Sequence, residues 1–112
     1  MTPDRLHYLD VSLISFEKSL RWGHIEGVAG FLPADKPIDT ETLARYEQVE
    51  VGSYNTLSRS LNSDGNEATI LVTIDYVDKE SMRVYKATDR QLWKYDDEGN
   101  RWYLASPLPS LR

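Results

Sequence analysis

The spacing of apolar residues changes once along the chain, near residue 47. Before that point apolar residues recur at intervals of three and four, which is the spacing of one face of a helix. From residue 48 onward apolar and polar residues alternate, and turn-forming residues interrupt the alternation, as in strands that bury one face. Helices first and strands second is the order of the α+β class, in which helices cover one face of an antiparallel sheet.

The first predicted helix spans about residues 3–21. Thr2 is its expected N-cap, Pro3 fits its first turn, and Asp4 lies at the positive end of the helix dipole. Its buried stripe consists of Leu6, Leu9, Leu13, Phe16 and Leu20. This stripe predicts that the helix packs along the sheet.

Two shorter helices are predicted before the sheet. One covers residues 24–32 and stops before Pro33, because the residue before a proline disfavours helical backbone. The other begins at a cap formed by Asp39 or Thr40 and runs through Tyr46.

Turn signals set the register of the four predicted strands. Asp64-Gly65 favours a two-residue hairpin, and longer turns are expected at residues 78–81 and 97–100. Counting outward from the first turn pairs Leu57 with Val72. The face toward the helices then contains Val49, Val51, Leu57, Leu61, Ile70, Val72, Ile74, Tyr76, Tyr85, Ala87, Trp93, Tyr95, Trp102 and Leu104. The opposite face carries Thr56, Ser58, Thr69, Thr73, Asp75, Lys86, Thr88, Arg90 and Lys94.

Several polar side chains fall on the apolar face in this register, namely Asn55, Arg59, Arg83, Asp89 and Gln91. Arg59 and Asp89 are both expected to neighbour Ile70, from opposite sides of the middle strand. One interpretation is a polar patch at the floor of a pocket, with Asp89 as a general base if burial raises its pKa. The other is an Arg59–Asp89 ion pair that closes the open end of the sheet.

Length and charge limit the function classes. With 112 residues the chain is expected to form a single domain, 1–112, with a helical part at 1–47 and a sheet at 48–112. Lys and Arg number 13 against 18 Asp and Glu, a net charge of −5 that argues against nucleic-acid binding. The chain has no cysteine and two histidines, so neither a metal site nor a cofactor is expected.

The beginning of the chain bears on its compartment. The first ten residues contain neither the basic start nor the apolar run of a secretory signal, and the sequence holds no membrane span. The sequence as written predicts a cytoplasmic protein. Removal of a leader would instead make it periplasmic or a membrane-anchored lipoprotein.

The order of the predicted elements carries a resemblance. An amphipathic first helix breaks at Trp22-Gly23, a short helix passes through Phe31-Leu32, a third helix follows, and the last strands read Leu-Trp-Lys-Tyr-Asp-Asp-Glu-Gly-Asn-Arg-Trp-Tyr-Leu at residues 92–104. This order resembles the nuclear transport factor 2-like superfamily. The resemblance implies a cone, in which a curved sheet wraps around helices and leaves a pocket at the wide end. It also implies a homodimer formed through the sheet.

Members of that superfamily include ketosteroid isomerase-like enzymes and many binding and assembly proteins, so the resemblance leaves three hypotheses. The first is a noncatalytic domain that binds a small apolar molecule or a protein. The second is a small isomerase, dehydratase or hydrolase with Asp89 as general base, and the third is an assembly module of an envelope lipoprotein. The predicted pocket residues are Asn55, Arg59, Tyr76, Tyr85, Asp89, Gln91 and Trp93.

Overall fold

The computed structural model describes residues 5–111. Three helices precede four strands in the order α1 (Arg5–Arg21), α2 (Ile25–Ala29), α3 (Thr40–Glu47), β1 (Val49–Leu61), β2 (Glu67–Asp78), β3 (Val84–Asp96) and β4 (Arg101–Leu104). The strands form one antiparallel sheet in the order β1-β2-β3-β4. The α+β class is therefore confirmed. The predicted roles of Thr2, Pro3 and Asp4 lie outside the described residues.

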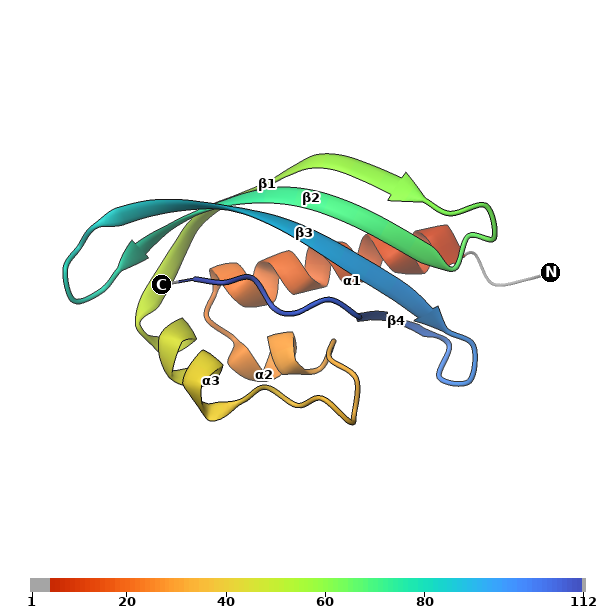
Figure 1. Ribbon diagram of the computed structural model, residues 1–112, viewed down its shortest axis with the longest axis horizontal. Helices are drawn as coiled ribbons and strands as arrows, with labels where there is room; N and C mark the ends of the chain where they lie inside the picture. Colours follow the sequence, from red (N-terminus) through yellow and green to blue (C-terminus); the bar gives the residue numbers. More distant parts are fainter. Residues whose placement is uncertain (1–4, 112) are drawn as a thin grey trace.

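The sheet curves over α1, and α2 and α3 lie on the same side of it (Figure 1). Alternate residues of β2 are almost completely buried, as expected for a central strand with one face on the core. From α1, Leu9, Phe16 and Leu20 enter this core. The predicted stripe thus packs on the sheet, although Leu6 at its N-terminal end is largely exposed.

As the sequence predicts, α1 ends just before Trp22-Gly23. Gly23 adopts a positive φ of 71°, which glycine tolerates without steric cost. The His24 amide then donates to the Ser19 carbonyl and the Gly23 amide to the Leu20 carbonyl. These two hydrogen bonds are those of a Schellman motif, so they satisfy carbonyls at the helix end and leave Trp22 at the surface.

The two short helices differ in how well they match the prediction. α2 ends at Ala29, because the amides of Phe31 and Leu32 donate to carbonyls three residues earlier and tighten the last turn. α3 begins as predicted. The Asp39 carboxylate accepts a hydrogen bond from the Thr42 amide at 2.7 Å, and this bond lowers the pKa of Asp39 below its usual value.

The predicted register is confirmed for β3–β4 and for the hairpin end of β1–β2, and it is wrong in the middle of β1 and between β2 and β3. Leu61 pairs with Ala68, and Trp93 with Leu104, as expected. Closer to the start of β1, the pairing of β1 with β2 shifts by one residue at Leu57. A β-bulge of this kind adds one unpaired residue to a strand and turns the side chains beyond it to the other face.

This bulge overturns several side-chain assignments in β1. Leu57 is 57% exposed instead of buried, and Val72 pairs with Thr56. Asn55 pairs with Thr73 and so lies on the outer face, away from the helices. In its place Tyr54, which pairs with Ile74, points toward the core. A second shift between Val51 and Ser53 keeps Val51 buried.

The β2–β3 hairpin has a longer loop than predicted. Its strands end at Asp78 and resume at Val84, and the Asp78 carboxylate accepts hydrogen bonds from the amides of Glu80 and Ser81. The register consequently differs by two residues from the prediction, so that Ile70 pairs with Gln91 rather than Asp89. A shift of two keeps every side chain on its predicted face, because the side-chain period of a strand is two.

Candidate functional site

Three polar side chains from two different strands meet on the inner face of the sheet. Asp89 and Gln91 lie two residues apart on β3, and Tyr54 reaches them from β1 across the central strand. Gln91 is completely buried. We refer to Tyr54, Asp89 and Gln91 as the polar cluster.

Gln91 organises this cluster through both ends of its amide. Its Nε2 donates to the Tyr54 hydroxyl at 2.9 Å, and its Oε1 accepts from the Trp93 indole Nε1 at 2.9 Å. The buried amide therefore has partners for donor and acceptor, which is the condition under which a buried polar group is tolerated. The hydrogen bonds also fix Tyr54 in place.

Asp89 is the least satisfied member of the cluster. Burial raises the pKa of its carboxyl group, and hydrogen bonding from Gln91 opposes that rise only in part. Its Oδ2 atom is buried and has no hydrogen-bond partner. Burial also raises the pKa of Tyr54 to about 12, and the negative charge of Asp89 contributes in the same direction.

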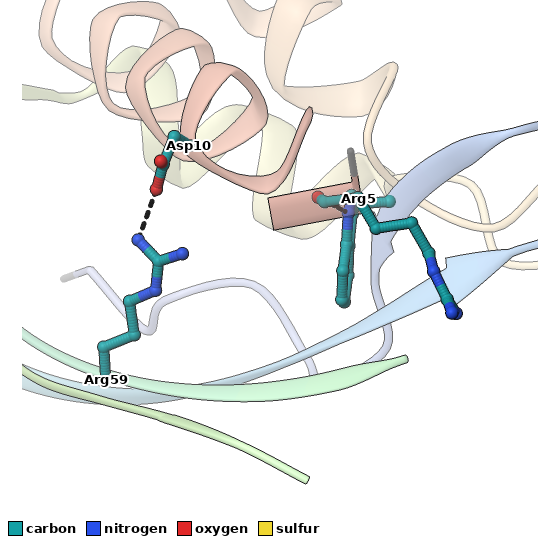
Figure 2. A network of polar contacts seen from close by, with 4 residues as sticks. Arg5, Asp10 and Arg59 are labelled. Carbon is teal, nitrogen blue, oxygen red and sulfur yellow. Dashed lines mark hydrogen bonds and ion pairs between the residues drawn. The ribbon is translucent and has the colours of Figure 1, made fainter. Parts of the chain in front are cut away.

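Arg59 does not pair with Asp89. Figure 2 shows its guanidinium reaching from β1 to the Asp10 carboxylate on α1, where the two form a hydrogen-bonded ion pair. Arg59 pairs with Ile70 as predicted, but β3 presents Gln91 there, so the expected Arg59–Asp89 contact is wrong. The side chains are 34% and 52% exposed, so the ion pair contributes at most about 1 kcal/mol.

The other predicted pocket residues lie in different parts of the core. Tyr76 and Tyr85 stack with ring centroids 5.5 Å apart, next to the β2–β3 hairpin. Trp93 is completely buried, where it packs edge-to-face against the rings of Phe16 and Phe31. The predicted set is therefore spread along the whole sheet. Only Asp89 and Gln91, with Trp93 as their neighbour, form one group.

A recess of about 400 Å³ opens where α1 ends and β1 begins. This hollow, the α1 recess, is lined by Leu20, Arg21, Trp22, Gly23, Ile25, Tyr46, Val49, Glu50, Val51, Lys79 and Leu111. Its floor is made of core side chains that are at most 8% exposed, whereas Trp22 at its rim is 76% exposed. The apolar floor and the exposed aromatic ring suit the apolar body of a ligand, and Arg21, Glu50 and Lys79 add charged groups to the lining.

A second hollow, the α3 groove, has a volume of about 610 Å³ and lies between α3 and the C-terminal residues. Its wall includes the whole segment from Leu104 to Leu111. Tyr46 and Leu111 line both this groove and the α1 recess, so they separate the two hollows. The Tyr46 hydroxyl donates to the Pro109 carbonyl at 2.6 Å and thereby fixes this partition.

Comparison with known proteins identifies the fold. No protein-family model and no curated protein sequence matches this chain. A solved structure, that of a ketosteroid isomerase-like protein from Erwinia carotovora atroseptica SCRI1043, superposes with a TM-score of 0.62. The alignment covers 95% of this chain and 100% of the other at 14% sequence identity. The chain has the nuclear transport factor 2-like fold. The resemblance seen in the sequence is thereby confirmed at the level of fold.

Within this nuclear transport factor 2-like fold, the residues that line the hollows are not those that the sequence indicated. No member of the predicted pocket set lines the α1 recess or the α3 groove. A role of the predicted pocket residues in binding stays a prediction. Tyr46 and Leu111 were missed because their importance depends on a contact between α3 and the end of the chain, more than 60 residues apart. The one signal in the sequence was Trp22, which stands directly before Gly23 at the end of the first helix.

Residues 5–111 can be compared with the requirements of a metal site and of a membrane-spanning helix. No group of three or more His, Cys, Asp or Glu side chains in that range is arranged to hold a metal ion. No helix in the same range is long and apolar enough to cross a membrane.

Proposed function

We propose that this protein is a noncatalytic binding domain that holds a small apolar molecule in the α1 recess. The observation that carries the proposal is the combination of an apolar floor with an exposed tryptophan at the rim. A volume of about 400 Å³ falls in the range of small-molecule pockets, about 300–1,000 Å³. The nuclear transport factor 2-like fold is compatible with this role but does not decide it.

Trp22 supports the proposal because most of its ring is exposed to solvent in the free protein. Large aromatic rings dominate binding energies, since each removes a large apolar area from water when a ligand covers it. At 76% exposure most of that area is still in contact with solvent. A ligand in the recess would cover part of the indole.

Binding of N-phenyl-1-naphthylamine, a neutral apolar dye, tests the proposal. We expect the wild-type protein to bind one dye molecule, with energy transfer from tryptophan to the dye. Trp22→Ala should weaken binding about tenfold, because losing a stacked aromatic contact is worth about 1.4 kcal/mol. Met82→Ala, which alters another side chain that is 71% exposed, is the matched control and should bind normally. Equal affinities for the two variants, or no wild-type binding, would refute the proposal.

The second candidate is a small isomerase, dehydratase or hydrolase with Asp89 as general base. It is favoured by the buried Asp89 Oδ2 atom, which has no hydrogen-bond partner, and by the raised pKa of the carboxyl group. If the protein has such an activity, Asp89→Asn should lower turnover at least about a hundredfold, which is the lower limit for losing a general base. Turnover that survives this substitution would exclude Asp89 as the base.

Three further predictions from the sequence are not addressed by either candidate function. A homodimer formed through the sheet, a protein ligand, and an envelope lipoprotein each stay a prediction. Sedimentation of the purified protein would measure its oligomeric state directly.

A further inference from the structure

The α1 recess has positive charge beside its apolar floor, although the chain as a whole is acidic. Two cationic side chains line it, Arg21 at the end of α1 and Lys79 just beyond the end of β2. The whole chain has 13 Lys and Arg against 18 Asp and Glu, a net charge of −5. The charge of the recess lining therefore differs in sign from that of the molecule, and it acts on any charged group that enters the recess.

Glu50 is the one acidic residue among the described residues that line the recess, and its side chain points away from the floor. Its neighbours Val49 and Val51 are buried on the inner face of the sheet. Because successive side chains of a strand point to opposite faces, Glu50 leaves β1 toward the outer face, where it is exposed. Within residues 5–111, no ion pair joins Glu50 to Arg21 or Lys79. Glu50 therefore does not neutralise the two cations.

Arg21 and Lys79 have protein partners that leave other donors for a ligand. The Arg21 guanidinium lies 3.5 Å from the Glu17 carboxylate one turn earlier in α1, and the two side chains are 47% and 32% exposed. Such a pair contributes at most about 1 kcal/mol, so a ligand can compete with it. Lys79 Nζ donates to the Glu47 carbonyl at 3.1 Å, which holds the ammonium at the end of α3. A guanidinium has five N–H donors and an ammonium three, so both side chains can also bind an anion.

We propose that the ligand of the α1 recess is an amphipathic anion, whose apolar body covers Trp22 and the floor and whose single anionic group is bound by Arg21 and Lys79. The inference rests on the proposed function, because it adds an anionic head group to the apolar ligand of the same recess. The arrangement of the lining gives the ligand one orientation, with its apolar part on the core side chains and its charge at the two cations. A cationic head group would be repelled there.

The two cations make the binding of an anion sensitive to salt. Both side chains are in contact with solvent, so dissolved ions screen their attraction for a ligand. A neutral ligand with the same apolar body lacks this dependence. Two dyes allow the comparison, because 8-anilinonaphthalene-1-sulfonate is N-phenyl-1-naphthylamine with one sulfonate group added.

The test measures the affinity of both dyes for full-length wild type, Arg21→Gln and Lys79→Gln. We expect each substitution to weaken binding of the sulfonate dye about threefold, and the double variant about tenfold, with less than about a twofold change for the neutral dye. Raising the salt concentration from about 0.05 M to about 0.5 M should weaken only the sulfonate dye. Lys94→Gln is the matched control, because it removes the same charge from a residue that lines neither the α1 recess nor the α3 groove. It should change neither affinity.

The outcomes separate the anionic head group from the proposed function. If wild type binds the neutral dye and the Arg21 and Lys79 variants bind the sulfonate dye as wild type does, the inference is wrong and the proposed function stands. If wild type binds only the sulfonate dye and the two variants weaken it, the anion site stands and the proposed function for a neutral ligand is refuted. Binding of neither dye overturns both. An equal loss in Lys94→Gln would also overturn the inference, because it would reflect net charge alone. Arg21→Gln decides the question if Lys79→Gln does not fold.

Discussion

Replacing Trp93 with alanine is expected to lower the free energy of unfolding by about 3–5 kcal/mol. Its side chain is completely buried and packs edge-to-face on Phe16, with ring centroids 5.2 Å apart, and on Phe31 at 5.6 Å. The substitution leaves a large cavity in this aromatic group. It also removes the indole donor from the Gln91 amide, whose oxygen then lacks its partner.

Urea unfolding followed by circular dichroism measures this loss. Trp22→Ala is the matched control, because it removes the same side chain from a position where it is 76% exposed. Its effect on stability should stay within about 0.5 kcal/mol. If Trp93→Ala were no more destabilising than Trp22→Ala, the packing of α1 on the inner face of the sheet would be wrong.

Replacing Asp89 with asparagine is expected to stabilise the protein at pH 7 by on the order of 1 kcal/mol. The pKa of Asp89 is raised from its ordinary value of 3.8, so the folded state disfavours the ionised carboxylate. Because the pKa is raised in the folded state, ionisation of Asp89 costs stability, and this cost is absent at low pH and grows as pH rises from about 3.8 through the folded-state pKa. Asparagine has the shape of the carboxyl group without the charge, so it avoids this cost.

Chemical unfolding of the wild type and of Asp89→Asn between pH 3.5 and about pH 8 tests the direction of the change in stability. The advantage of Asp89→Asn should disappear toward the acidic end, where wild-type Asp89 is protonated. Asp75→Asn is the control, because Asp75 on the outer face accepts from the Ser53 hydroxyl at 2.7 Å and lies 3.7 Å from the Lys86 ammonium. It should gain no stability at neutral pH. A loss of stability in Asp89→Asn at pH 7 would show that the carboxylate is well solvated or paired.

Local signals were sufficient for much of the fold. The Asp39 cap of α3, the break at Gly23 and the β3–β4 register follow from the backbone preferences of a few adjacent residues. Alternation in β2 was also correctly interpreted, since a central strand with one buried face repeats with period two. Even the wrong length of the β2–β3 loop preserved the faces, because the error was two residues.

The bulge at Leu57 had no comparable signal. The polar and apolar residues around it fit either register, so the choice depends on how β1 bends to follow the curved sheet over α1. That one extra residue moved Asn55 to the outer face and brought Tyr54 to Gln91. The polar cluster is therefore a product of the tertiary structure, although both of its β3 members were predicted on the inner face.

The sequence by itself determined the class, the order of the helices and strands, and the buried faces, because these depend on contacts between near neighbours and on a period that survives small errors. The tertiary structure alone decided where the hollows of the molecule lie. The α1 recess and its partition combine α1, α3, β1 and the C-terminal segment that contains Leu111, and the hydrogen bond from Tyr46 to Pro109 spans 63 positions. The spacing of apolar residues along the chain does not predict a contact between residues so far apart. Such a contact depends on how the elements between them pack.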